Sequence, residues 1–250
     1  YRFSKTLLFL SEYSKNRFKD YYSLSNPDLV IIPGGVDLKD FHPLEVEENN
    51  NAIREKLNLK KDVPLILTVR RLEERMGLEN LILAVEILLK KNPAKIFQLA
   101  MVGKGSLKQR LEDLIAEKKL SDTVHLTGLV PKKTLPLYFR VADLFVLPTT
   151  AIEGFGLVTV EAFASGLPVM GTPVGATKEI LALVDQSLIF EGTSPESLAK
   201  GMEHFLDNPE HYSQLKLKCR ETAEKNYSWE KVTDQTEKEF IKSTFGNSPS

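Results

Sequence analysis

From residue 63 onward, short apolar runs alternate with longer stretches in which apolar residues recur at helical spacing. The apolar runs span residues 63–69, 96–103, 123–128, 142–149, 167–175 and 187–192. Continuous apolar strands of this kind are typical of a parallel sheet that is buried on both faces. Because strands and helices alternate strictly, we predict a doubly wound, Rossmann-like α/β sheet of about six strands with right-handed crossovers.

The two ends of the chain follow other patterns. Two apolar runs near the start, TLLFLS and LVIIPGG, predict strands on either side of a helix, and after Pro195 the pattern is helical until a short tail. The polar, asparagine-rich stretch between Val36 and Val63 predicts a linker with one short helix. We therefore divide the chain into residues 1–36, 37–62, 63–227 and 228–250. Because the first residue is Tyr1 rather than Met, we expect a fragment of a longer protein.

The composition excludes several classes of protein. The chain has 33 basic and 34 acidic side chains, which argues against a dedicated nucleic-acid-binding protein. A single cysteine excludes a disulfide framework and suits a reducing, cytoplasmic compartment. No apolar run approaches the roughly 20 residues that span a bilayer. Lys15, Arg17 and Lys19 could contact an acidic membrane, although a solvated helix face is the favoured interpretation.

No metal site is expected. The four histidines are scattered, no Cys/His spacing suggests zinc, and no Asp-x-Asp pair occurs. The glycine-containing segment VGKGS, residues 102–106, lacks the spacing of a phosphate-binding loop and predicts a tight strand-to-helix turn.

The segment EGFGLVTVE places two carboxylates, Glu153 and Glu161, on either side of a turn with Gly154 and Gly156. Glycines allow close approach of a ligand, and a helix N-terminus favours phosphate. A carboxylate one turn further can accept hydrogen bonds from a ribose diol, and the other can bind a second sugar. The segment therefore predicts a nucleotide diphosphate sugar as ligand. The spacing equally allows that both carboxylates merely favour a helix start.

Cations follow the first strong strand, where VRRLEERMG supplies Arg70, Arg71 and Arg75. The carboxyl ends of parallel strands meet at one edge, so we expect these arginines near Glu153. Arginine donates paired hydrogen bonds that suit a diphosphate. The alternative is that these arginines form ion pairs at the surface with the neighbouring Glu73 and Glu74.

Together these segments resemble the retaining glycosyltransferases of family four, which have a two-domain, GT-B type architecture. The resemblance runs from about Ile31 to Phe240. It is carried by IPGGVDLKDFHP, VRRLEERMGLENLILAV, AMVGKGSLKQRLEDLI, VHLTGLVPKKTLPLYFRVADLFVLPT, EGFGLVTVE with seven residues between its glutamates, EAFASGLPVMGTPVGATKEI and NYSWEKV, in the family's order.

The resemblance implies a role for each matching position. Glu153 would contact the donor sugar near the reacting centre and Arg71 the diphosphate, which makes these two the predicted catalytic residues. Glu161 would bind the ribose. The remaining predicted donor-binding residues are Gly35 in the turn between domains, Arg75 beside the diphosphate, Leu129 and Val130 at the base, and Gly154, Phe155, Gly156 and Leu157 along the sugar and diphosphate.

Two positions depart from the family pattern. Met76 stands where the family usually has lysine, and we expect the adjacent Arg75 to supply the missing charge. Gly34 stands where the family usually has asparagine.

The resemblance implies that residues 1–36 are the remnant of an N-terminal acceptor domain, 37–62 the linker, 63–227 the donor-binding domain and 228–250 a crossing helix and tail. We predict a metal-independent retaining hexosyltransferase that uses a UDP- or GDP-linked sugar. Its glycan or lipid-linked acceptor would bind through the missing domain, so the fragment alone would be weakly active or inactive. The alternatives are a non-catalytic nucleotide-sugar-binding module and, disfavoured by the motif order, a sugar-nucleotide epimerase.

Overall fold

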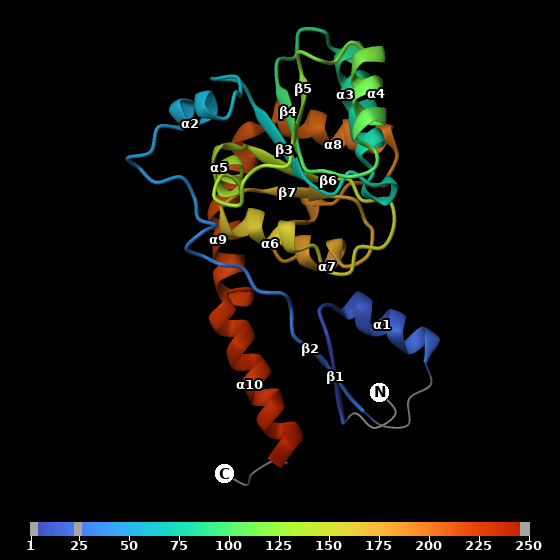
Figure 1. The fold of residues 1–250 in the computed structure, drawn as a ribbon, viewed down its shortest axis with the longest axis vertical. Coiled ribbons are helices and arrows are strands. Elements are labelled where there is room, and N and C mark those ends of the chain that lie inside the picture. The colour runs from blue at the N-terminus through green and yellow to red at the C-terminus, as the bar shows by residue number, and fades with distance from the viewer. Residues whose placement is uncertain (1–4, 23–26, 246–250) are drawn as a thin grey trace.

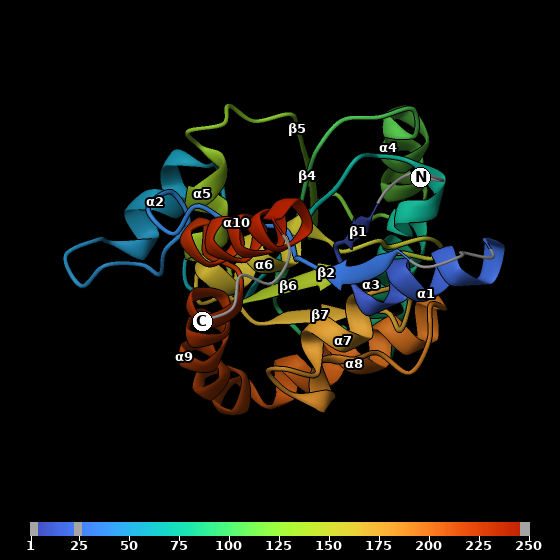
Figure 2. The same ribbon diagram turned by 90° about the horizontal axis from the view of Figure 1, so that it is seen from below.

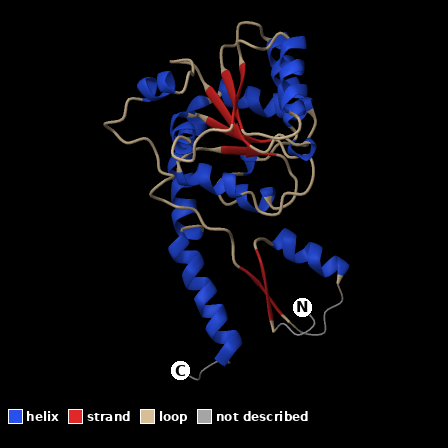
Figure 3. Ribbon diagram, in the orientation of Figure 1, coloured by secondary structure: helices blue, strands red, loops and turns tan. Residues whose placement is uncertain are grey.

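The computed structural model describes residues 5–22 and 27–245, and a five-stranded parallel sheet lies at its centre (Figure 3). The strands are β3 (Leu65–Val69), β4 (Gln98–Val102), β5 (Val124–Gly128), β6 (Leu144–Leu147) and β7 (Val169–Gly171). Their order across the sheet is β5-β4-β3-β6-β7. All residues of β4, β6 and β7 are buried, as expected for strands covered on both faces. The predicted doubly wound α/β fold is confirmed.

The sheet has one strand fewer than the sequence suggested. Residues 187–192 were expected to form a strand, but they begin within a short 3-10 helix, η2 (Gln186–Leu188). The Asp185 side chain accepts a hydrogen bond from Ser187 N and so stabilises this turn. Only Ile189 pairs with the sheet, through a single parallel bridge to Gly171.

Helices cover both faces of the sheet (Figure 1). The path from β3 to β5 runs in one direction, so right-handed crossovers place α3 (Leu78–Lys91) and α4 (Lys108–Glu117) on one face. There α8 (Pro195–Asp207) packs on α3. The path then returns through β6 and β7, which places α5 (Leu135–Val141) and α6 (Leu157–Ala164) on the other face. On that face α9 (Pro209–Asn226) packs on α6, and α7 (Thr177–Leu181) follows β7.

The start of the chain forms a separate parallel pair of strands, β1 (Thr6–Phe9) and β2 (Asp28–Ile31), joined by α1 (Glu12–Tyr21). Helix α1 starts at a reciprocal cap between Ser11 and Ser14. The predicted linker contains the expected short helix, α2 (Asn50–Lys56). The role of residues 1–36 as the end of an acceptor domain, and the domain boundaries as drawn, stay predictions.

The last helix, α10 (Trp229–Phe245), leaves the main sheet and runs beside β1 and β2 (Figures 1 and 2). As predicted, it begins after Ser228, whose Oγ accepts a hydrogen bond from Lys231 N at 3.3 Å. Near its far end, Lys242 Nζ lies 3.5 Å from Asp28 Oδ2 in β2. Within residues 5–22 and 27–245, no helix combines the length and apolarity needed to cross a membrane.

Candidate functional site

The site lies where the strand order reverses. Strand β3 leads on to β4 and strand β6 to β7, in opposite directions across the sheet, although β3 and β6 are neighbours. Loops that leave two such strands diverge and open a crevice at their carboxyl ends, where ligands of doubly wound folds bind. Arg70 directly follows β3, and the segment from Thr149 to Glu153 follows β6. The topology therefore brings the two predicted motifs together.

An ion pair joins these loops. Arg70 Nη2 lies 2.6 Å from Glu153 Oε2, and the two side chains are only 8% and 10% exposed. Thr149 Oγ1 donates a hydrogen bond to the same carboxylate oxygen at 3.1 Å and accepts one from Arg70 Nη2 at 2.9 Å. Charge-assisted hydrogen bonds are stronger than neutral ones, so this network holds the Glu153 side chain in one position.

The backbone of Glu153 is also fixed, by contacts with the residues that follow β7. Its carbonyl accepts a hydrogen bond from Ala176 N at 2.9 Å. Gly175 has a φ of +62°, and a Cβ there would lie 2.0 Å from Glu153 O. Gly154 differs, since a Cβ there would meet nothing within 4 Å. Among the described residues no packing contact requires glycine at 154. Its backbone is exposed to a ligand, although its carbonyl accepts a hydrogen bond from Ser11 Oγ at 2.7 Å.

Helix α6 begins immediately after this loop, at Gly156 with a φ of +84°. No side chain within residues 5–22 and 27–245 caps the helix, so its first amides lack the usual side-chain acceptor. The Phe155 side chain is buried and packs edge-on against Tyr227, with ring centroids 5.7 Å apart. Leu157 is exposed. This end of α6 therefore presents free N–H groups and positive partial charge.

A pocket of about 370 Å³ opens beside the ion pair. Its lining is mostly apolar and includes three cations but no carboxylate; the residues are Val69, Arg70, Arg71, Met76, Val102, Gly103, Lys104, Leu129, Val130, Leu135 and Val158. Such a lining suits a ligand with a flat apolar part and an anionic part. Leu129 and Val130, predicted to contact a base, both lie here.

Glu161 lies on α6 three residues after Val158, and therefore on the helix face that is turned to the pocket. Burial raises the pKa of the Glu161 carboxyl to about 7. Among the residues that the structure describes, none forms a hydrogen bond with this carboxyl group. A half-buried carboxyl without a partner is costly and can be compensated by a ligand hydroxyl.

The arginines are arranged differently from the sequence prediction. Arg71 lines the pocket but is exposed. The guanidinium beside Glu153 belongs to Arg70, which was expected near Glu153 but was given no role by the family resemblance. Arg75 donates from Nη1 to the carbonyl of Ile152 at 2.8 Å, so it supports the loop from outside. Arg75 was expected to supply the charge of a lysine at 76, but the guanidinium that contacts the Met76 side chain is that of Arg70, with Nη2 2.9 Å from Met76 Sδ.

Thr149, Lys104 and the role of Arg70 were missed by the sequence analysis. Side chains alternate in direction along a strand, so two successive arginines at its end point to different sides. This alternation was the only signal in the sequence, and it does not say which of the two arginines points to Glu153. The burial of Thr68 and the partial exposure of Val69 in the structure agree with Arg70 pointing inward and Arg71 outward.

The VGKGS segment forms the predicted turn between β4 and α4. Gly103 has a φ of +152°, and a Cβ there would lie 1.8 Å from Arg70 O. Backbone hydrogen bonds from Arg70 N to Val102 O and from Leu72 N to Lys104 O, both 3.0 Å, hold the two loops together. The glycine thus serves the placement of Arg70.

Gly34 and Gly35 lie in the turn before the linker, where both are tightly packed. A Cβ on Gly35 would come within 2.5 Å of the Trp229 ring, and one on Gly34 within 2.6 Å of Leu157 Cδ2. Packing of α10 and α6 explains both glycines. The predicted contact of Gly35 with the donor stays a prediction.

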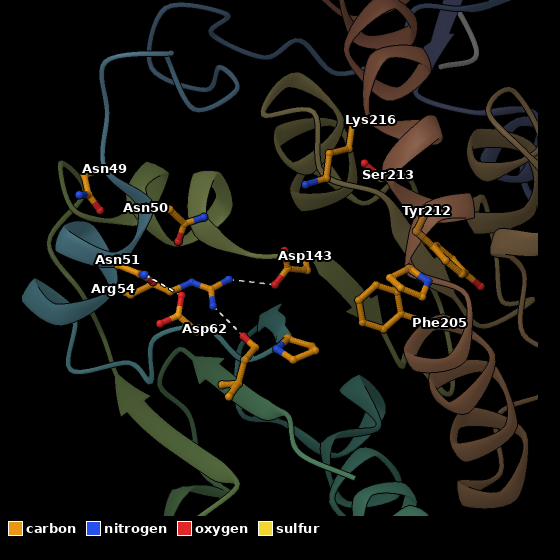
Figure 4. Close-up of a pocket in the computed structure, with 13 residues that line it drawn as sticks. Asn49, Asn50, Asn51, Arg54, Asp62, Asp143, Phe205, Tyr212, Ser213 and Lys216 are labelled. Carbon is orange, nitrogen blue, oxygen red and sulfur yellow. Dashed lines mark hydrogen bonds and ion pairs between the residues drawn. The ribbon is translucent and has the colours of Figure 1, made fainter.

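A second pocket, of about 540 Å³, lies at the opposite end of β3 and β6, where the strands begin (Figure 4). The buried Arg54 stands in its wall and donates to Val63 O at 2.6 Å, to Val141 O at 2.7 Å and to Asp143 Oδ2 at 2.9 Å. These bonds tie α2 to the segments that lead into the two strands. Because Arg54 is fully engaged and the strands begin here, we interpret this pocket as a structural junction.

No group of three or more His, Cys, Asp or Glu side chains within the described ranges is arranged to hold a metal ion. Metal independence stays a prediction.

Known proteins show the same combination of motifs and fold. The profile of the family "Glycosyl transferases group 1" matches residues 49–225. A GDP-mannose-dependent monoacylated alpha-(1-6)-phosphatidylinositol monomannoside mannosyltransferase from Corynebacterium glutamicum is 30% identical over 231 residues, which cover 90% of this chain and 58% of that protein. The chain thus spans less than two thirds of this curated relative.

Solved structures of other proteins show the same fold. Sucrose-phosphate synthase from Thermosynechococcus elongatus superposes with a TM-score of 0.81 at 26% identity, over 96% of this chain and 58% of that one. A glycosyltransferase from Rickettsia africae shares the fold with a TM-score of 0.85 at 21% identity, over 98% of this chain and 64% of that one. The family match covers well over half of the chain, and the chain therefore belongs to the glycosyl transferases group 1 family, as its motifs predicted.

Proposed function

We propose that this chain is the donor-binding part of a glycosyltransferase that moves a hexose from a nucleoside diphosphate sugar to a hydroxyl acceptor. One observation carries the proposal. The buried pair of Arg70 and Glu153 stands at the strand-order reversal, beside an apolar pocket with three cations and no carboxylate in its lining. This arrangement suits a ligand with a flat base, an anionic centre and a polyol at its far end.

Each part of such a donor has a complementary surface. The base lies against Leu129 and Val130, and the ribose diol binds the otherwise unpaired Glu161. The diphosphate meets Arg71 and the uncapped start of α6. The transferred sugar then lies over Gly154, within reach of the carboxylate of Glu153.

The chemistry that we propose is stabilisation of the leaving group. As the bond between the sugar's anomeric carbon and the diphosphate oxygen breaks, its electron pair stays on that oxygen. The pocket cations and the α6 amides bind this growing charge. The acceptor oxygen forms the new bond on the same face of the sugar, which retains the configuration, and its proton passes to the departing diphosphate. No metal is required in this scheme.

The acceptor is proposed to bind mainly through parts of the protein outside this chain. The Corynebacterium relative is named for a GDP-mannose donor and a phosphatidylinositol glycan acceptor, so GDP-mannose and a lipid-linked glycan are among the substrates to test. A lipid-linked acceptor implies peripheral membrane contact in the cytoplasm. The chain by itself should transfer sugar weakly or not at all.

Calorimetric titration with UDP, GDP and ADP in the presence of EDTA tests the proposal. We expect saturable binding of one nucleotide, weakened at least tenfold by Glu161→Ala. Absence of binding to the full-length protein for all three nucleotides would refute the donor site. Nuclear magnetic resonance of the full-length enzyme's product tests retention, and an inverted anomer would exclude it.

A non-catalytic nucleotide-sugar-binding module is the second candidate, and Met76 is the observation that favours it. The resemblance places a lysine at this position, which would add a cation at the diphosphate. The two candidates differ in turnover. If the full-length protein is a binding module, it should bind the nucleotide sugar but should not consume it, whichever extract is added as a source of acceptor.

A further inference from the structure

The side chain of Met76 lies against a cation that comes from a different element. Met76 is 4% exposed, and its Sδ lies 2.9 Å from Arg70 Nη2. Arg70 reaches this point from the end of β3, whereas Met76 ends the short helix η1 (Glu74–Met76). The position where the resemblance places a lysine ammonium is therefore next to a guanidinium.

We propose that Arg70 binds the donor diphosphate in place of that lysine and simultaneously holds Glu153 at the sugar. This inference rests on the proposed function and deepens it. It assigns one side chain to both ends of the bond that breaks, the leaving group and the sugar, and it makes Arg70 a catalytic residue of this chain.

The unused donors of Arg70 support the assignment. In the part of the chain that the structure describes, every hydrogen bond of its guanidinium is made by Nη2, which contacts Met76, Thr149 and Glu153. Among the described residues neither Nε nor Nη1 has an acceptor. The Nε atom is fully buried, so Nη1 is the donor that a ligand can reach. A guanidinium whose only task was to neutralise Glu153 would be expected to place its remaining N–H groups on protein acceptors. Arg70 instead lines the pocket and keeps its Nη1 atom free for an anion.

The neighbouring cations are less suited to this position. Arg71 and Lys104 are exposed, and Arg75 is engaged by the Ile152 carbonyl. Arg70 is 8% exposed, so its charge acts in a less polar surrounding, where it stabilises an anion more strongly. An exposed arginine can attract the diphosphate, but the buried one can bind it in a defined geometry.

The test moves the charge back to position 76. In the full-length protein, calorimetry compares the wild type with Arg70→Gln, with the double variant Arg70→Gln/Met76→Lys, and with Arg17→Gln as a control at an exposed arginine on α1. The probes are UDP with uridine and GDP with guanosine, so that each diphosphate is matched by its own nucleoside. Thermal unfolding without ligand confirms that each variant is folded.

We expect Arg70→Gln to lose at least tenfold in affinity for the diphosphate and less than twofold for the nucleoside. Met76→Lys in that background should recover at least part of the loss, and Arg17→Gln should match the wild type. Equal losses for diphosphate and nucleoside, or an unchanged diphosphate affinity, would overturn the proposal and leave the proposed function standing. If the wild type bound neither diphosphate, both would fall.

Discussion

The hydroxyl of Ser11 donates a hydrogen bond to the carbonyl of Gly154 at 2.7 Å. This contact joins the unit at the start of the chain to the loop that carries Glu153. Glu179 of α7 strengthens the junction, because its carboxylate accepts hydrogen bonds from Glu12 N at 3.2 Å and Tyr13 N at 3.4 Å. The start of α1 is thus fastened directly to the proposed donor site.

Loss of this junction should loosen α1. Ser11→Ala removes both the helix cap and the bond to Gly154, and we expect a cost of about 1–2 kcal/mol to the docking of α1. Hydrogen exchange of the α1 amides should become several-fold faster, while the amides of β3 and β4 keep their protection. Ser14→Ala is the matched control, since it removes the other half of the cap but leaves the Gly154 contact. Equal protection of α1 in all three proteins would contradict this account.

Nucleotide binding should depend on pH through Glu161. With a pKa near 7 in the free protein, this carboxyl is largely protonated at pH 6 and ionised at pH 8. A ribose diol donates best to the ionised form, so we expect affinity to rise by up to about tenfold from pH 6 to pH 8. Glu161→Gln should bind more weakly at pH 8 and show a flat profile in calorimetry. A profile equally steep in this variant would assign the titration to another group.

The same carboxyl should lower stability at high pH. Its pKa in the folded protein lies above the ordinary value of 4.5, so the folded state binds more protons than the unfolded state between pH 4.5 and 7. Stability from this group is therefore lost as the pH rises through that window. Glu161→Gln should raise the free energy of unfolding at pH 8 by on the order of 2–3 kcal/mol and by little at pH 4. Denaturant unfolding at the two pH values measures the difference.

Two glycines of the site should respond in opposite ways to alanine. At Gly175 a Cβ would clash with Glu153 O, and φ is positive. Gly175→Ala should therefore lower the free energy of unfolding by about 1–3 kcal/mol. At Gly154 the space is open, so Gly154→Ala should leave stability within about 0.5 kcal/mol and reduce affinity for the nucleotide sugar. Unfolding curves and calorimetry of the two variants separate these effects. Full affinity in Gly154→Ala would argue against a sugar at this backbone.

The pocket of Figure 4 should matter for stability alone. Arg54→Met removes a buried guanidinium, which leaves two carbonyl groups without this donor and Asp143 with Leu65 N but without its ion-pair partner. We expect a loss of about 3–5 kcal/mol of stability. Below the unfolding transition the folded variant should bind nucleotide as tightly as the wild type. Selective loss of nucleotide binding in a stable Arg54→Met protein would instead identify this pocket as the ligand site.

Much of this architecture could be predicted from the sequence, for identifiable reasons. The buried strands have no polar face, so their apolar runs were visible, and parallel topology alone placed the arginine loop near Glu153. The helical region after Pro195 was visible as a change of pattern, and the crossing helix within residues 228–250 was implied by the resemblance. These features depend on a few neighbouring residues or on simple topology.

The remaining features depend on contacts between distant residues. Whether Arg70 or Arg71 meets Glu153 is decided by how the strand end is held, and Gly103 in another loop sets that position. The apolar run at 187–192 fails to continue the sheet because Asp185 stabilises a turn at its start. The free carboxyl of Glu161 became apparent only from its burial in the folded protein.

A crystal structure of this protein with a nucleoside diphosphate tests the central claim most directly. We expect the base against Leu129 and Val130, the ribose at Glu161, and the diphosphate between the start of α6 and the Nη1 atom of Arg70. A nucleotide bound in the pocket beside Arg54, or one whose diphosphate lies away from the crevice between β3 and β6, would contradict it.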